Sequence, residues 1–173
     1  MLRYNERMTN EDHVSSILAQ WAAERPDVDV SPMGIVGRIS RLSLVVDKEL
    51  EPVFVQFGLN HWSFDMLATL RRAGAPYRLS PTELFRSMMV TSGTMTNRID
   101  RLEEKGLVRR IPDPEDRRGI LVELTEQGRE LLDSVLIAHV ANEARLLQSL
   151  SIEDQQTLAV LLRKWLASLE HHS

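Results

Sequence analysis

Apolar residues recur at helical spacing through most of the chain, three or four positions apart. Residues 11–24 carry the first such stripe, which predicts an amphipathic helix. A second stripe begins after Ser31 and Pro32, a pair typical of a helix start because serine can cap the helix and proline suits its first turn. It continues with the same period to Phe57, and we expect Gly58 to end it. The first third of the chain therefore predicts two helices.

Capping signals delimit three shorter helices in the middle of the chain. Ser80, Pro81 and Glu83 form a capping box, in which the serine and glutamate side chains bind each other's main-chain amides. Gly74 and Gly106 follow apolar runs and are expected to end helices. The last two of the three helices are joined by a short turn with a glycine, which fits a helix-turn-helix. The predicted helices cover residues 61–73, 81–89 and 92–105.

After Gly106 the pattern changes from helical to alternating. Residues 107–111 read LVRRI and residues 119–124 read GILVEL, with a polar turn between them, so we expect a β-hairpin. A helix-turn-helix followed at once by a hairpin is a winged helix, whose wing arginines enter the minor groove or contact phosphates. An ordinary hairpin with a solvated polar tip is the alternative at this point.

The last third of the chain predicts two long amphipathic helices. Thr125 begins the first, which extends to about Leu150, and Ser151 begins the second. Neither apolar stripe has an obvious partner in so small a chain, so we expect a helical interface between two copies related by a twofold axis. An ordinary core within one chain is the alternative. We expect an N-terminal helix and first dimerisation helix, a winged helix-turn-helix lobe, and C-terminal dimerisation helices, at residues 1–59, 60–125 and 126–173.

Charge is distributed unevenly along the 173 residues. The net charge of −4 at pH 7 by itself disfavours a nucleic-acid partner. Residues 71–118, however, contain eleven Lys or Arg and seven Asp or Glu, whereas the rest of the chain contains ten and eighteen. A basic middle between acidic flanks is what a phosphate-facing surface requires.

The composition disfavours several other classes of function. The absence of cysteine excludes disulfides, thiolate redox sensing and cysteine-zinc sites. The five histidines lack zinc-ligand spacing, and no phosphate-binding glycine loop or G-x-S-x-G motif occurs, so we expect no metal, no cofactor and no catalysis. Without an apolar run of about 18 residues or a signal-peptide core, a cytoplasmic protein with no membrane span is expected. A helical interaction module that does not bind DNA is a further alternative.

A longer motif joins the helix-turn-helix to the hairpin. The segment reads LSPTELFRSMMVTSGTMTNRIDRLEEKGLVRRIPDPEDRRGILVELTEQG. It contains a D-x-R wing pattern and then an apolar strand that ends in L-T-x-x-G, on Asp116, Arg118, Leu124, Thr125 and Gly128. In these features the chain resembles the MarR family of winged-helix repressors over about residues 32–170. The resemblance implies a mainly α fold with a small β-hairpin wing and a helical dimerisation region.

A finer resemblance is to the urate-responsive, PecS-like branch of that family. The branch has an extra N-terminal helix, which residues 11–24 supply. It also has four ligand-linked residues, and these match Trp21 in LAQWAAE, Asp65 in WSFDML, Arg98 in MTNRID and Arg110 in LVRRIP. The resemblance implies that a small anionic aromatic effector, urate first, releases the protein from DNA. A phenolic or aromatic carboxylate such as salicylate is the alternative effector.

The four residue types suit a planar anion. An indole offers a stacking face and a guanidinium offers a fork of planar donors. Asp65 is expected to pair with an arginine while the site is empty, and an incoming anion would compete for that arginine. The alternatives are structural: Trp21 as core packing, and Asp65 with Arg98 as an ordinary ion pair.

The resemblance also indicates how the dimer would bind double-stranded DNA. Two recognition helices would enter successive major grooves roughly 10 bp apart, so the operator is expected to be a pseudo-palindrome. Arg117 or Arg118 would enter the minor groove, with Asp116 holding one of them, and the resemblance favours Arg118. The predicted DNA-binding residues are Ser92, Thr94, Thr96, Asn97, Arg101, Asp116, Arg117 and Arg118.

Overall fold

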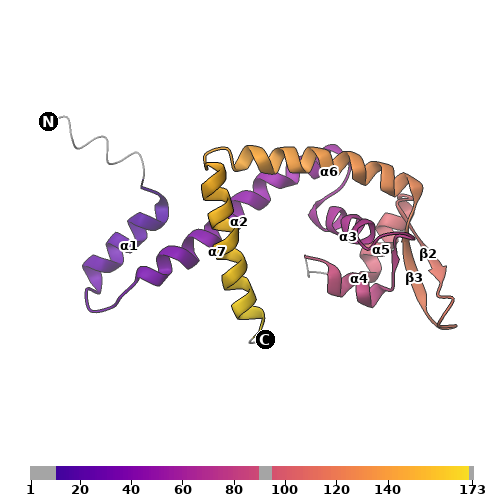
Figure 1. Cartoon of the computed structure of the whole chain (residues 1–173), viewed down its shortest axis with the longest axis horizontal. Coiled ribbons are helices and arrows are strands. Elements are labelled where there is room, and N and C mark those ends of the chain that lie inside the picture. Colours follow the sequence, from indigo (N-terminus) through magenta and orange to yellow (C-terminus); the bar gives the residue numbers. More distant parts are fainter. Residues whose placement is uncertain (1–10, 90–94, 172–173) are drawn as a thin grey trace. The chain divides into compact units, whose positions relative to one another are not determined.

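The fold is mainly helical with a small antiparallel sheet, as the sequence predicts (Figure 1). The computed structural model describes residues 11–89 and 95–171. The chain divides into two compact units, one up to Glu49 and one from Leu50 onward. The helices are α1 (His13–Glu24), α2 (Ser31–Gln56), α3 (His61–Arg72), α4 (Pro81–Ser87), α5 (Met95–Glu104), α6 (Glu126–Leu146) and α7 (Ile152–Glu170), and the strands are β1 (Arg78–Leu79), β2 (Val108–Pro112) and β3 (Ile120–Leu124).

The predicted capping signals in the second unit are confirmed. The Ser80 hydroxyl accepts the Glu83 N–H, and the Glu83 carboxylate accepts the Ser80 N–H in return. Thr125 and Ser151 cap α6 and α7, because their hydroxyl groups accept the N–H groups of Gly128 and Asp154 in the first turn. The three predicted helix-ending glycines have the left-handed backbone that a side chain disfavours, with φ of 69° at Gly58, 82° at Gly74 and 71° at Gly106.

The start of α2 differs from the prediction. Ser31 is the first residue of the helix rather than its cap, and its N–H donates to the Asp29 carboxylate at 3.0 Å. The Asp29 side chain therefore supplies the acceptor that we expected from the serine. The helix continues to Gln56 through Pro52.

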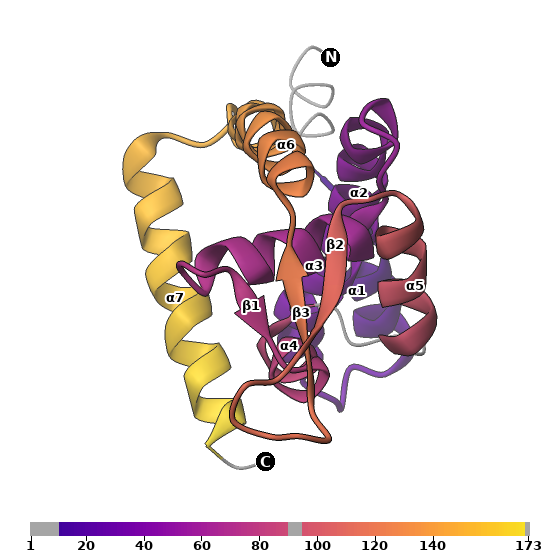
Figure 2. The same ribbon diagram turned by 90° about the vertical axis from the view of Figure 1, so that its right-hand side faces the viewer.

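The sheet has a third strand that the sequence analysis missed. Strand β3 lies between β1 and β2, and both pairs are antiparallel (Figure 2). Arg78 of β1 is opposite Glu123, and Arg110 of β2 is opposite Val122. The two-residue β1 therefore joins the segment before α4 to the predicted hairpin.

Helix α3 forms the centre of the second unit and contacts α4, α6 and β3. Phe54, at the end of α2, is fully buried and stacks on Phe64, with ring centroids 4.8 Å apart. Burial of these apolar side chains from every surrounding element supplies the main stabilising term. Side chains with less than 2% exposure include Met66, Leu67, Leu70, Leu84, Ile99, Leu102, Val108, Val122, Leu132 and Val135.

The L-T-x-x-G motif joins the hairpin to α6. The Thr125 hydroxyl donates to the Gly106 carbonyl at 2.7 Å and accepts the Gly128 N–H at 3.0 Å. Gly128 is buried, and a Cβ at this position would lie 2.1 Å from the Leu107 carbonyl oxygen. Only glycine allows the first turn of α6 to approach the start of β2 so closely.

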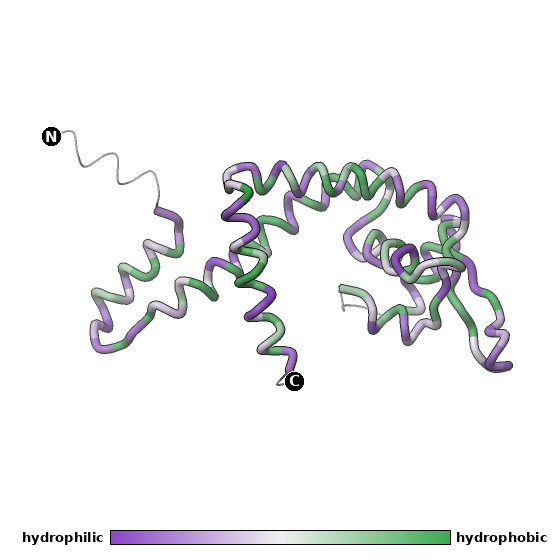
Figure 3. Tube along the Cα trace, in the orientation of Figure 1, coloured by the Kyte–Doolittle hydropathy of each residue, from purple (hydrophilic) through white to green (hydrophobic). Residues whose placement is uncertain are grey.

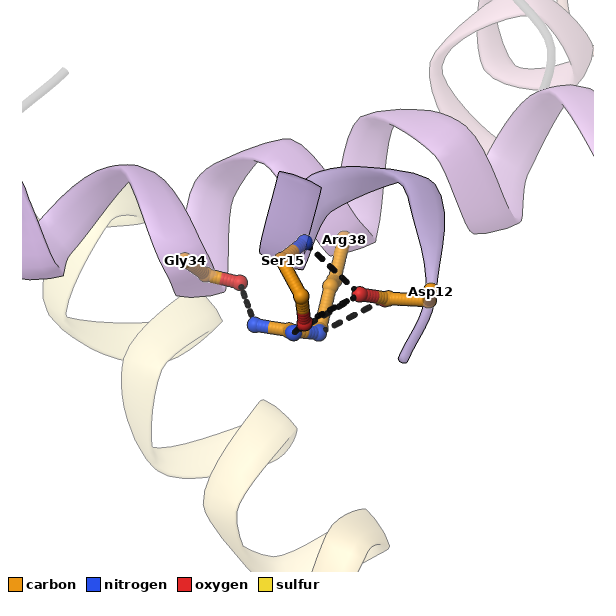
Figure 4. Close-up of polar contacts among 4 residues, drawn as sticks. All are labelled: Asp12, Ser15, Gly34 and Arg38. Atoms are coloured by element: carbon orange, nitrogen blue, oxygen red, sulfur yellow. Dashed lines mark hydrogen bonds and ion pairs between the residues drawn. The ribbon is translucent and has the colours of Figure 1, made fainter. Parts of the chain in front are cut away.

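In the first unit, Arg38 of α2 holds the start of α1 (Figure 4). Its Nε and Nη2 donate to the two carboxylate oxygens of Asp12 at 2.9 Å, and Nη2 also donates to the Ser15 hydroxyl at 2.8 Å. Its Nη1 donates to the Gly34 carbonyl at 2.9 Å. Hydrogen bonds from Ser15 and then from Arg38 lower the pKa of Asp12 to about 2, so this contact stays ionised well into the acidic range.

Helix α7 exposes a row of large apolar side chains. None of its residues is buried within the single chain, and Figure 3 shows apolar positions repeating along it. The large exposed side chains of α7 are Ile152, Leu158, Val160, Leu161, Leu162, Trp165, Leu166 and Leu169.

Among the residues that the structure describes, no helix is long and apolar enough to cross a membrane.

The close approach at Gly128 can be tested by adding one methyl group. We expect Gly128→Ala to lower the free energy of unfolding by about 3 kcal/mol, because the new Cβ would force the Leu107 carbonyl and α6 apart. Ser134→Ala, on an exposed position of the same helix, should change it by less than about 0.5 kcal/mol. Urea unfolding followed by circular dichroism measures both. Equal stability of the Gly128→Ala variant and the wild type would contradict the packing described.

Candidate DNA-binding surface and effector residues

The recognition helix α5 has a buried face and an exposed face. Ile99 and Leu102 are 2% and 1% exposed and attach the helix to the core. Three predicted DNA-binding residues, Thr96, Asn97 and Arg101, are exposed. Two more, Ser92 and Thr94, lie outside the described residues. The polar face can therefore contact a groove while the apolar face stays packed.

The wing places two arginines at its exposed tip. The Asp116 carboxylate accepts the Arg118 N–H at 2.9 Å, and the Asp116 carbonyl accepts the Gly119 N–H at 2.9 Å. Asp113 closes the other side of the turn by donating its N–H to the Gly119 carbonyl at 3.0 Å. Arg117 and Arg118 are both exposed. Asp116 thus holds the main chain of Arg118 and orders the turn that carries both arginines.

Arg110 ties the wing to the recognition helix. Its guanidinium forms ion pairs with Asp100 and Glu103 of α5, and its main-chain N–H donates to the Glu103 carboxylate at 2.8 Å. Burial acts to lower the pKa of Arg110, but the hydrogen bonds that it donates to Asp100 and Glu103 outweigh burial and raise that pKa. This side chain is therefore charged and anchored between β2 and α5.

The Asp65 carboxylate binds the main chain just after the end of α4. The residue is 5% exposed, and its Oδ2 accepts the Met89 N–H at 2.8 Å. Its Oδ1 lies 3.8 Å from Nη1 of Arg72, one of two consecutive arginines at the end of α3. The expected pairing of Asp65 with an arginine therefore exists, and the partner seen is Arg72. Met89 lies two residues after the end of α4, so Asp65 holds the main chain just beyond that helix.

Arg98 lies over an aromatic ring that the sequence analysis did not consider. Its Cζ is 5.3 Å from the centroid of Trp62, on the first turn of α3, which is within the range of a cation–π contact. Positions 98 and 103 are roughly 140° apart around a helix. The Arg98–Trp62 contact and the Arg110–Glu103 pair therefore hold α5 from opposite sides of its buried face.

Trp21, the fourth predicted effector residue, belongs to the first unit. It lies in the last turn of α1, and 44% of its surface is exposed. An indole this exposed is not core packing within the single chain.

In the described part of the chain, no group of three or more His, Cys, Asp or Glu residues could hold a metal ion.

Comparison with known proteins places the chain in a family. The MarR family model matches residues 59–120. The HTH-type transcriptional regulator PecS from Dickeya dadantii is 45% identical over 86% of this chain and 90% of its own length. The chain belongs to the MarR family. It is a PecS-like transcriptional regulator and not an enzyme.

Solved structures of MarR-family proteins share its fold. AbsC from Streptomyces coelicolor has a TM-score of 0.73 at 26% identity, over 83% of this chain and 97% of its own. A mutant MarR from Escherichia coli, solved in complex with operator DNA, has a TM-score of 0.67 at 29% identity, over 78% and 94% of the two chains. This MarR-family chain therefore has the predicted winged helix-turn-helix.

Three side chains at this site were missed because nothing local marks them. Trp62 contacts Arg98 on another helix, whereas Arg72 and Glu103 pair with Asp65 and Arg110, each seven positions away in the sequence. Trp62 and Arg98 are 36 positions apart, and a periodicity analysis treats each as an isolated residue. The excess of basic residues between positions 71 and 118 was a signal for Arg72 but not for the acidic Glu103.

The buried hydrogen bond of Asp65 gives a stability prediction. We expect Asp65→Asn to lower the free energy of unfolding by about 1.5 kcal/mol, because a charged acceptor for the Met89 N–H becomes a neutral one. Asp133→Asn removes the same charge from an exposed pair with Arg71 and should cost less than about 0.5 kcal/mol. Thermal unfolding of both variants measures the difference, and equal effects would mean that burial of Asp65 contributes nothing.

Proposed function

We propose that this regulator is a repressor that binds a pseudo-palindromic operator as a homodimer and is released by a small anionic aromatic effector, urate first. The observation that carries this proposal is 45% identity to PecS over most of both chains, together with an exposed polar face on the recognition helix and an arginine-tipped wing. The cytoplasm is its proposed place of action.

The DNA contacts are proposed from residue chemistry. Thr96, Asn97 and Arg101 carry donors and acceptors for base edges and phosphates on the exposed face of α5. Arg117 and Arg118 are exposed at the wing tip, where a guanidinium fits the negative potential of a narrow minor groove. The undescribed Ser92 and Thr94 remain part of the proposed surface.

The homodimer is proposed from the apolar surface of the terminal helices. Eight large apolar side chains of α7 are exposed in the single chain, far more than isolated surface residues would explain. Leu136, Ile137 and Val140 extend the exposed apolar surface along α6. Two copies that bury these helices around a twofold axis would remove them from water and pair the recognition helices.

The effector residues proposed are Trp21, Asp65, Arg98 and Arg110. Two of them are arginines that hold the recognition helix, and one is a buried carboxylate that holds the main chain just beyond α4. An anion that binds an arginine and repels the carboxylate would change the contacts that position α5. Such a ligand releases DNA only if it binds the released state more tightly than the DNA-bound state.

A fluorescence-anisotropy titration on DNA from upstream of the gene tests this proposal. We expect tight binding that weakens as salt rises and is reversed by urate. We expect Arg118→Ala to weaken it by about 10- to 100-fold, the range for loss of one specific arginine contact. Arg25→Ala removes the same charge from the first unit and should bind as the wild type does.

Each result has a separate meaning. Unchanged affinity of Arg118→Ala would remove that residue from the DNA contact. Binding that ignores urate but is reversed by salicylate would replace the proposed effector with an aromatic carboxylate. Failure of the wild type to bind any DNA fragment from its gene region would contradict the proposed repressor.

A further inference from the structure

Trp62 lies under the guanidinium of Arg98 in a cation–π contact. Trp62 is on the first turn of α3 and is half-buried, and its ring centroid is 5.3 Å from Cζ of Arg98. The contact joins α3, which is packed in the core, to the recognition helix. A cation over an indole gains an attraction that is largest for tryptophan among the aromatic residues.

This contact competes with any anion that moves the guanidinium. A planar anion that draws the cationic head of Arg98 off the indole must outweigh the attraction of the ring. If the arginine rests on the indole for most of the time, the apparent affinity for the anion equals the intrinsic affinity multiplied by the fraction of time that the arginine is free. A partner of Arg98 within the protein therefore weakens effector binding and keeps the recognition helix attached to α3.

We propose that Trp62 is a resting partner of Arg98 and a positioning residue for the recognition helix, and that the effector acts by drawing Arg98 away from the indole. This inference rests on the proposed function, since it takes Arg98 as an effector-binding residue. It assigns a regulatory role to a side chain outside the four that the family resemblance implies.

The surroundings of Trp62 supply a specific alternative. A cavity of about 370 Å³ adjoins the residue, and its lining includes Asn60, Arg101 and Lys105. A planar anion bound there would stack on Trp62 itself. The two arrangements predict opposite effects of removing the indole on effector affinity. The affinity rises if Trp62 competes for Arg98, and it falls if Trp62 contacts the effector.

The test is isothermal titration calorimetry of urate into the full chain without DNA. We expect Trp62→Leu to lower the Kd for urate about twofold to fivefold, which matches the strength of a partly exposed cation–π contact. Trp62→Gln should do the same and serves if the leucine variant folds poorly. Trp62→Phe keeps an aromatic face and should stay within about twofold of the wild type.

The outcomes separate this inference from the proposed function. A wild type that is released from DNA by urate, with Leu and Gln variants whose Kd for urate is unchanged or raised, would overturn the role of Trp62 and leave the function standing. A wild type that binds operator DNA but not urate would overturn the effector and this inference together. Because a merely structural role of Trp62 would not tighten effector binding, a lowered Kd supports the competition.

Discussion

The recognition helix depends on the burial of Ile99 and Leu102. With ten residues, α5 is too short to be stable in water by itself, and most of its remaining side chains are polar or charged. Its position is therefore set by the core formed by α3, the sheet and α6. The helix presents its polar face to solvent because its opposite face is anchored.

Contacts on either side of this buried face fix the orientation of the helix. Arg110 reaches from β2 to Asp100 and Glu103, and Trp62 lies under Arg98. Asp65 holds the main chain at Met89, where α4 has just ended. These polar contacts are individually weaker than the burial of two apolar side chains, so a ligand can exchange them without unfolding the lobe. Arg98 and Arg110, the two arginines that the family resemblance links to an effector, are parts of this support, so the proposed effector would act directly on the contacts that position α5.

The parts of the fold that were predictable from sequence are those specified by neighbouring residues. Capping at Ser80, Thr125 and Ser151 and the glycine helix ends depend on a few adjacent positions, and all are confirmed. Strand β1 was missed because two residues carry no alternation, and pairing with β3 alone defines it. The sequence showed Gly128 only as the last residue of the L-T-x-x-G motif, without the reason why glycine is needed there. The cause, the Leu107 carbonyl, lies just before β2 and 21 positions earlier in the sequence.

The sequence predicted which residues form the candidate site, but it did not predict the contacts that they make. The resemblance indicated Asp65, Arg98 and Arg110, but their partners Met89, Trp62 and Glu103 come from other elements or from across the hairpin junction. Pairing between distant segments follows from packing, which a single sequence does not encode locally.

Hydrogen exchange of the main-chain amides of α5 tests most directly whether effector binding reaches the recognition helix. The measurement compares operator-free protein with and without saturating urate. We predict faster exchange in residues 95–104 when urate is bound, because the helix loses a contact on the α3 side, and unchanged exchange in the central part of α3. Unchanged or slower exchange in α5, with urate bound, would contradict the account.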